Sequence, residues 1–105
     1  MLLKHLVRAC ALAGAMGAFT LPANALSEEE VSVLAGTCAN CHGTDGRSPG
    51  VIPSIAGQPY DILHEQLLAF KAGEVAGATI MTRHALGYSD EELEALARYF
   101  SEIEQ

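Results

Sequence analysis

Cys38, Cys41 and His42 form the pattern Cys-x-x-Cys-His, which carries more chemical information than any other part of the chain. Two thiols at this spacing can bond the two vinyl groups along one edge of a porphyrin. The histidine that follows the second thiol then falls under the iron as its proximal ligand. The pattern therefore predicts covalent attachment of one haem c.

Two other kinds of site use a Cys-x-x-Cys pair. A thioredoxin-type redox pair requires a βαβ framework, and the sequence shows no pattern for one. A structural zinc site requires four ligands arranged in pairs, whereas only the scattered His64 and His84 follow this motif. Haem attachment is thus the favoured interpretation.

The N-terminal residues predict export. Residues 1–21 are largely apolar and carry charges only at Lys4 and Arg8, and their uncharged stretch is shorter than the roughly 20 residues that span a bilayer. The small-x-small sequence at residues 23–25 follows. We therefore expect residues 1–25 to be a cleaved secretory signal peptide, and residues 26–105 to be a single mono-haem domain in the periplasm. Both motif cysteines and no others remain there, which disfavours a chance match.

The charge of the chain argues against some classes of partner. It has 6 basic and 13 acidic side chains among its 105 residues. Removal of Lys4 and Arg8 leaves 4 basic residues, so the net charge becomes 4 − 13 = −9. This balance disfavours nucleic acid and anionic membrane surfaces as partners. We expect no membrane span in residues 26–105.

The second axial ligand is predicted to be Met81, the one methionine of residues 26–105. It lies in residues 75–82, which show neither a helical nor a strand period and are predicted to form a loop. A thioether favours Fe(II), so histidine–methionine ligation would raise the reduction potential. Met81 could instead fill the core. His84 is the first rival for this ligand position, and His64 is a weaker one. His84 could instead be a solvated histidine in a loop.

Three segments predict amphipathic helices. Capping boxes at residues 27–30 and 89–92 each open one, and the first leads directly to the haem motif. Pro59 begins the remaining helix and Gly73 ends it. No stretch alternates with a period of two, so the predicted fold class is all-α, with three to four short helices around one haem. The apolar positions of these helices are Val31, Leu34, Ala35, Ile62, Leu63, Leu67, Phe70, Leu93, Leu96, Ala97, Phe100 and Ile103.

Residues 51–57 could orient the proximal histidine. A histidine that ligates a metal needs an acceptor for its second ring nitrogen. The carbonyl of Pro53 is a candidate, since proline is stiff and has no N–H, and Ile52 and Ile55 could then pack against the porphyrin. An ordinary X-Pro turn explains the same residues, and spacing alone does not decide between the two.

The motif, the proline segment, the later methionine and the C-terminal amphipathic helix together resemble a class I c-type cytochrome. The segments at residues 70–74, 79–83 and 87–89 are similar to the cytochrome subunit of flavocytochrome c sulfide dehydrogenase, in its N-terminal haem domain. The resemblance implies that Cys38 and Cys41 hold the haem, that His42 and Met81 are its axial ligands, and that the carbonyl of Pro53 orients His42.

The resemblance also implies a partner. In that family the cytochrome docks beside an FAD-bearing subunit that oxidises sulfide. The cytochrome accepts the electrons from the flavin and passes them to a periplasmic acceptor. The chain differs from the best-known members in having a single haem motif, and in having His84 where an apolar residue is expected. A diffusible periplasmic electron carrier and a haem sensor remain alternatives. The resemblance further predicts that Leu93, Leu96, Tyr99 and Phe100 pack against Val31, Leu34 and Ala35.

Overall fold

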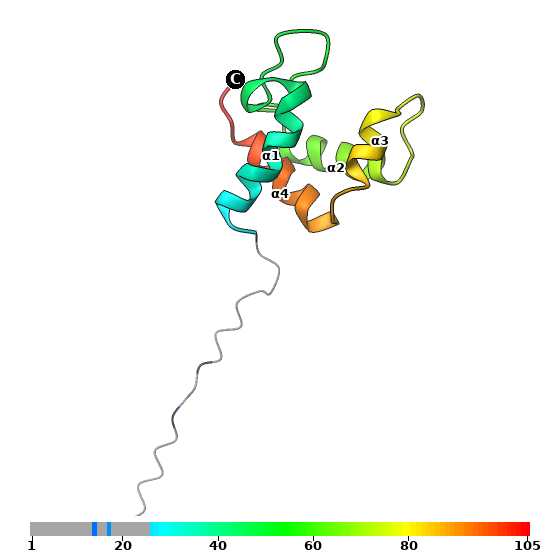
Figure 1. The fold of residues 1–105 in the computed structure, drawn as a ribbon. Coiled ribbons are helices and arrows are strands. Elements are labelled where there is room, and N and C mark those ends of the chain that lie inside the picture. Colours follow the sequence, from blue (N-terminus) through cyan, green and yellow to red (C-terminus); the bar gives the residue numbers. More distant parts are fainter. Residues whose placement is uncertain (1–13, 15–16, 18–25) are drawn as a thin grey trace, which may run out of the picture.

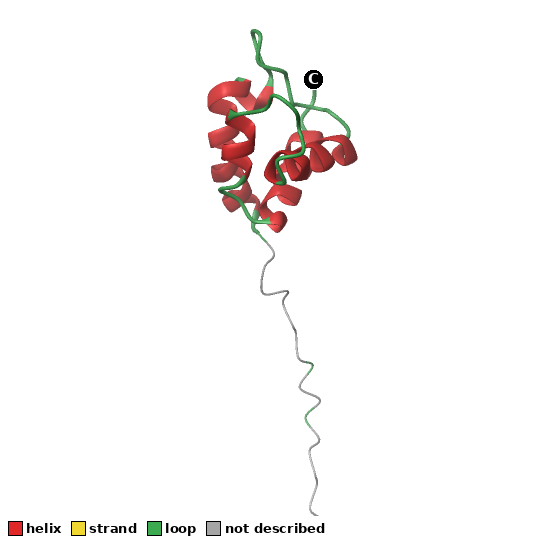
Figure 2. Cartoon of the chain, turned by 90° about the vertical axis from the view of Figure 1, so that its right-hand side faces the viewer, coloured by secondary structure: helices red, strands yellow, loops and turns green. Residues whose placement is uncertain are grey.

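The computed structural model describes residues 14, 17 and 26–105, and these residues form helices and loops without a strand (Figures 1 and 2). The four α-helices are α1 (Glu28–His42), α2 (Tyr60–Lys71), α3 (Ile80–Ala85) and α4 (Asp90–Ser101), with a short 3-10 helix, η1, at Thr44–Gly46. The expected all-α class is confirmed. The expected signal peptide, residues 1–25, lies outside the described residues apart from Gly14 and Gly17.

Helices α1 and α4 begin at the two capping boxes that the sequence predicts. The hydroxyl of Ser27 accepts a hydrogen bond from the backbone N–H of Glu30, whose carboxylate accepts one from the Ser27 N–H. Ser89 and Glu92 repeat this arrangement at α4. Each box satisfies two backbone donors that have no partner inside the helix, which fixes where these helices start.

Helix α2 begins directly after Pro59, as predicted, and ends at Lys71. Gly73 follows with a φ of +72°, a left-handed conformation that favours glycine. The ammonium group of Lys71 lies 2.7 Å from a carboxylate oxygen of Asp90, so an ion pair joins the end of α2 to the start of α4.

The prediction of a loop at residues 75–82 is wrong for its last residues. Helix α3 begins at Ile80, and Met81 therefore lies in the first turn of a helix. With six residues, α3 is too short to display a helical period in the sequence, and Thr79 at its start makes no side-chain capping bond. The helix packs against α2, and this tertiary contact stabilises a helix whose own sequence shows neither a helical period nor a side-chain cap.

The core lies where α4 meets α1 and α2. Leu93 and Leu96 are each 1% exposed, and Leu34 and Tyr99 pack against the same cluster from its edge. The contact expected between the first and last helices is thus confirmed. No helix among the described residues has both the length and the apolar character needed to cross a membrane. The buried members of the core are Val31, Ala35, Leu63, Leu93, Leu96, Ala97 and Phe100.

Candidate haem attachment site

The C-terminal end of α1 carries the whole Cys-x-x-Cys-His motif, from Cys38 to His42. Cys38 is partly buried against the core, Cys41 is exposed, and neither forms a disulfide. The helix ends at His42 because Gly43 turns the chain with a φ of +86°. A Cβ at Gly43 would lie 2.2 Å from the carbonyl oxygen of Arg47, so only glycine fits at this turn.

The ring of His42 is oriented by Pro53. Its Nδ1 donates a 2.6 Å hydrogen bond to the Pro53 carbonyl oxygen. This bond fixes the tautomer of the imidazole and leaves Nε2 as the nitrogen with a lone pair for a metal. The structure thus brings together two residues whose relationship the sequence spacing left undecided.

The electrostatics at Cys38 disfavour a redox dithiol. Burial raises the pKa of the Cys38 thiol, and the hydrogen-bond contacts of the thiol with the Thr37 side chain and with the backbone offset only part of this rise. Reactive cysteines of the thioredoxin type depend on a lowered pKa and a stable thiolate. The raised pKa of Cys38 is therefore the opposite of what such a redox pair requires.

A hydrogen bond joins α1 to the segment that follows α3. The hydroxyl of Thr37, the residue before Cys38, is bonded to the hydroxyl of Tyr88. The ring of Tyr88 in turn meets the ring of His84 edge-on, with centroids 5.4 Å apart. The helix that carries the thiols and the helix that carries Met81 are therefore connected by side chains near Cys38.

Met81 and His84 lie about one turn apart on α3, and both are partly buried. The Nε2 of His84 is buried and has no hydrogen-bond partner in the described residues. His84 is therefore not the solvated loop residue of the second interpretation given above. A buried ring nitrogen with a free hydrogen-bonding position keeps His84 as the rival of Met81.

The other rival, His64, is engaged on a different surface. Its ring stacks on Tyr60 with centroids 5.4 Å apart, and the guanidinium of Arg98 lies 4.5 Å from the centroid of the same tyrosine ring. These contacts belong to the packing of α2 against α4. They give the partly buried His64 a packing role at the contact between α2 and α4 without any ligand.

The two isoleucines beside Pro53 differ in their surroundings. Ile55 packs against the core cluster, close to Gly46 and Phe100. Ile52 is 39% exposed and Ile80, next to Met81, is 76% exposed. Large apolar side chains on the two segments that carry Pro53 and Met81 are thus available to cover an apolar ring.

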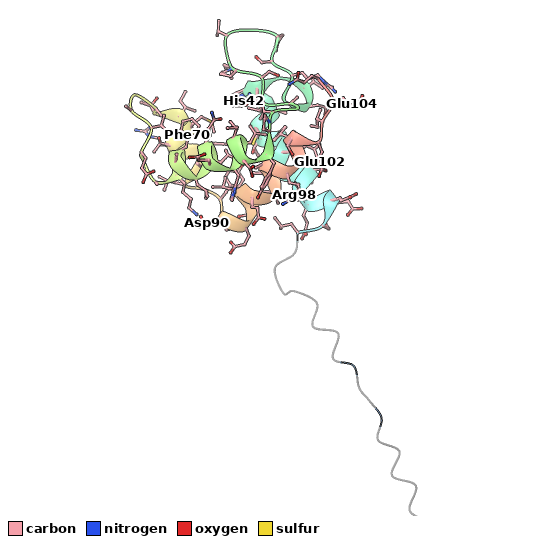
Figure 3. The ribbon with its side chains drawn as sticks, turned by 180° about the vertical axis from the view of Figure 1, so that it is seen from behind. His42, Phe70, Asp90, Arg98, Glu102 and Glu104 are labelled. Carbon is pink, nitrogen blue, oxygen red and sulfur yellow. The ribbon has the colours of Figure 1, made fainter. Side chains whose placement is uncertain are left out.

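Sequence reasoning missed the residues that hold the loop of residues 43–58 in place. Arg47 and Ser54 bond to backbone carbonyl groups, and these bonds leave no periodic signal. The one available clue is that Arg47 is the only basic residue of this loop. Figure 3 shows His42 at the base of the loop and Asp90 on the opposite side of the molecule.

Comparison with known proteins adds to this geometry. The family model described as Cytochrome c matches residues 28–104. The chain is 42% identical over 78 residues to the "Cytochrome subunit of sulfide dehydrogenase" of Chlorobaculum tepidum, covering 74% of this chain and 70% of that protein. It is 40% identical to "Cytochrome c-554(548)" of Halomonas halodenitrificans, covering 66% of this chain and 87% of that protein. It is 37% identical to "Cytochrome c-553" of Nitratidesulfovibrio vulgaris, covering 64% of this chain and 70% of that protein.

Proposed function

Because the chain belongs to the cytochrome c family and carries a covalently bound haem c, we propose that it is the electron-accepting subunit of a sulfide dehydrogenase. It would accept electrons one at a time from an FAD-containing subunit and pass them to a downstream acceptor in the periplasm. Similarity to a cytochrome subunit of sulfide dehydrogenase over 78 residues is the observation that carries this proposal.

Each residue of the site would hold a different part of the haem. Cys38 and Cys41 would form the two thioether bonds, His42 would bind the iron through Nε2, and Met81 would bind the opposite face. The bound haem supplies one-electron chemistry between Fe(III) and Fe(II). The free Nε2 left by the bond from His42 to Pro53 is the geometric support for His42 as the proximal ligand.

The protein's own contribution is to hold these ligands with little movement. The hydrogen bond to Pro53 orients the His42 imidazole and increases its electron donation, which tunes the potential. Ile52 and Ile55 would lie against the porphyrin and limit the access of water. If His42 and Met81 both bind the iron, no coordination position would stay open for a substrate, which supports electron transfer as the function.

A second candidate function is that of a diffusible periplasmic electron carrier. The chain also matches a cytochrome c-554(548) over 87% of that protein's length, and the name of that protein specifies no partner subunit, which favours this function. Both functions need the same haem site, and they differ in whether the chain forms a stable complex with a flavoprotein.

Native purification from periplasm, followed by haem absorbance, separates the two candidates. Co-elution of an FAD protein with the haem through successive columns would support the subunit. Elution as a lone monomer, with a haem that only other cytochromes reduce, would support the diffusible carrier and overturn the first proposal.

We also propose that residues 1–25 are removed on export. N-terminal sequencing of the purified protein should then begin at Leu26, directly before the capping box of α1. A sequence beginning at Met1 would contradict this assignment.

A further inference from the structure

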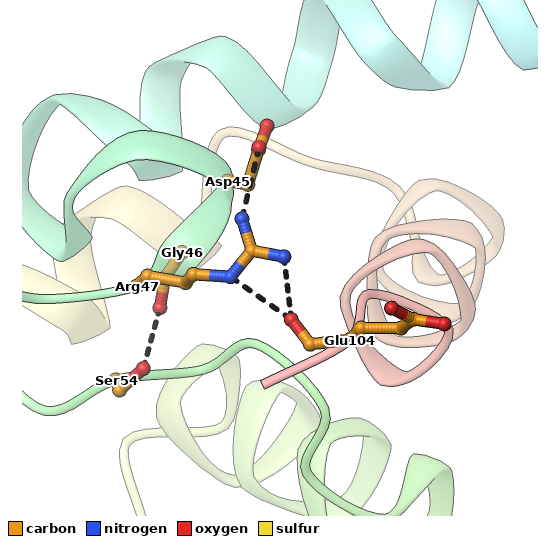
Figure 4. Close-up of polar contacts among 5 residues, drawn as sticks. All are labelled: Asp45, Gly46, Arg47, Ser54 and Glu104. Atoms are coloured by element: carbon orange, nitrogen blue, oxygen red, sulfur yellow. Dashed lines mark hydrogen bonds and ion pairs between the residues drawn. The ribbon is translucent and has the colours of Figure 1, made fainter.

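The loop that contains Pro53 is fixed at a single backbone carbonyl. The carbonyl oxygen of Gly46 accepts a hydrogen bond from the Ser54 hydroxyl at 2.8 Å (Figure 4). It also accepts hydrogen bonds from the N–H groups of Ile55 and Ala56 at 2.8 and 3.1 Å. These three donors directly follow Pro53 in the chain. The position of Gly46 therefore determines where the Pro53 carbonyl lies.

Gly46 is itself held tightly. Its φ is +78°, and a Cβ there would lie 2.7 Å from the Cγ1 of Ile55 and 2.9 Å from the Cδ1 of Phe100. Only glycine can bring the loop this close to α4. The backbone N–H of Gly57 also donates to the Phe100 carbonyl oxygen at 2.8 Å, so the loop is attached to the end of α4 on the far side of Pro53.

Arg47 attaches the near side of the loop to the C-terminal segment. Its Nε and Nη2 donate to the carbonyl oxygen of Glu104 at 2.9 and 2.5 Å, and its Nη1 lies 3.3 Å from the carboxylate of Asp45 (Figure 4). The ion pair is about half exposed on both sides and adds little. The forked contact with a backbone carbonyl is the specific one, since only a guanidinium presents two parallel donors.

We propose that Arg47 is a positioning residue for His42. By fastening the loop to Glu104, it holds Gly46, and through Gly46 it holds the Pro53 carbonyl against Nδ1 of His42. This proposal rests on the proposed function in one respect, that His42 is the proximal ligand. Loss of the Arg47 contact would let the carbonyl move away and weaken the electron donation of the imidazole.

The test uses the holoprotein with its haem attached, in the ferrous state for the exchange measurement and in a ferric–ferrous redox titration for the potential. Two quantities report on His42: the exchange rate of its Nδ1–H with solvent, measured by NMR, and the reduction potential. In Arg47→Ala the exchange rate should rise on the order of tenfold. The potential should also rise, because a weaker hydrogen bond to the imidazole stabilises Fe(III) less well.

Glu104→Ala is the matched control. Arg47 binds the backbone carbonyl of Glu104 and not its side chain, so this variant should keep both quantities unchanged. If Arg47→Ala lowers stability while the exchange rate and the potential stay as in the unaltered protein, Arg47 merely fastens the C-terminal segment and the proposal is overturned.

Arg47→Gln answers the question if Arg47→Ala yields no holoprotein. Glutamine offers one donor nitrogen in place of the two of Arg47 that bond to Glu104, and it carries no charge. The exchange rate of the His42 Nδ1–H should therefore still rise, and an unchanged rate and potential would overturn the proposal as well. None of these measurements uses sulfide or a flavoprotein, so failure of the proposed donor leaves them valid. Absence of a haem ring-current shift at the His42 ring in the unaltered protein would overturn the ligand assignment, and this proposal with it.

Discussion

The Nδ1 of His42 donates a 2.6 Å hydrogen bond to the carbonyl oxygen of Pro53, eleven residues further along the chain. Proline has no N–H and a fixed φ, so its carbonyl is a stiff acceptor that no competing donor on the same residue perturbs. The bond decides which nitrogen of His42 faces away from the loop. It is therefore the contact on which the assignment of His42 as an iron ligand depends.

Substitution of Pro53 by alanine keeps the carbonyl but loosens the backbone that holds it. We expect the free energy of unfolding to fall by about 0.5–1 kcal/mol. The reduction potential should rise, because the carbonyl spends less time bonded to His42. Denaturant titration and redox titration of the holoprotein measure the two effects. Pro49→Ala is the control, since Pro49 is an exposed residue of the same loop. It should lower stability by a similar amount but leave the reduction potential unchanged, and an equal rise of the potential in both variants would contradict a specific role for Pro53.

Substitution of Met81 by alanine should remove the proposed distal ligand. The ferric protein should then lose the weak far-red absorption that reports methionine sulfur on haem iron, and the reduction potential should fall, since the thioether stabilises Fe(II). His84→Leu, which introduces an apolar residue one turn away, should keep that absorption. A ferric spectrum that Met81→Ala does not alter and His84→Leu does would assign the distal position to His84.

Substitution of Tyr88 by phenylalanine removes the hydroxyl that bonds to Thr37 and leaves the ring beside His84 in place. The free energy of unfolding should fall by about 1 kcal/mol, the usual value of one such hydrogen bond. Tyr99→Phe is the matched control, because the Tyr99 hydroxyl makes no hydrogen bond within the described part of the chain. Equal losses in the two variants would show that the Thr37–Tyr88 bond does not stabilise the fold.

Tyr60 should titrate above the ordinary range of a tyrosine. Desolvation raises its pKa, the charge of Glu94 raises it further, and Arg98 lowers it. Glu94→Gln should therefore lower the pKa of Tyr60, and Arg98→Ala should raise it. NMR titration of carbon-13-labelled tyrosine measures both shifts, and shifts in the same direction would contradict the assignment of these neighbours.

The same shift links stability to pH. Because the pKa of Tyr60 is raised in the folded state, the folded protein holds this proton more tightly than the unfolded chain does. Its contribution to stability is thus complete below about pH 10, the ordinary tyrosine pKa, and is lost as the pH rises through the folded-state value. In Tyr60→Phe this alkaline loss should be smaller.

Local chemistry made two of the helices predictable. Ser27 with Glu30, and Ser89 with Glu92, bond to each other within four residues, so the sequence alone determines where α1 and α4 begin. The cysteine and histidine residues of the motif are likewise adjacent along one helix. Their placement follows directly from the start of α1.

Two features depended on contacts that the sequence does not display. The start of α3 at Ile80 is set by packing against α2, because Thr79 supplies no cap. The bond between His42 and Pro53 requires a loop whose path is set by Gly46 and Arg47 through backbone carbonyls. Every residue carries a backbone carbonyl group, so a hydrogen bond to such a group places almost no restriction on the residue type of the acceptor. No pattern of residue spacing therefore predicts these bonds.

The most direct test of the central proposal is the rate of haem reduction after sulfide is mixed anaerobically with the ferric protein, alone and together with a purified FAD-bearing sulfide dehydrogenase subunit. The haem should be reduced rapidly only when the flavoprotein is present, and the rate should saturate as its concentration increases. Equal rates with and without the flavoprotein, or no reduction in either mixture, would contradict the proposed role as its electron-accepting subunit.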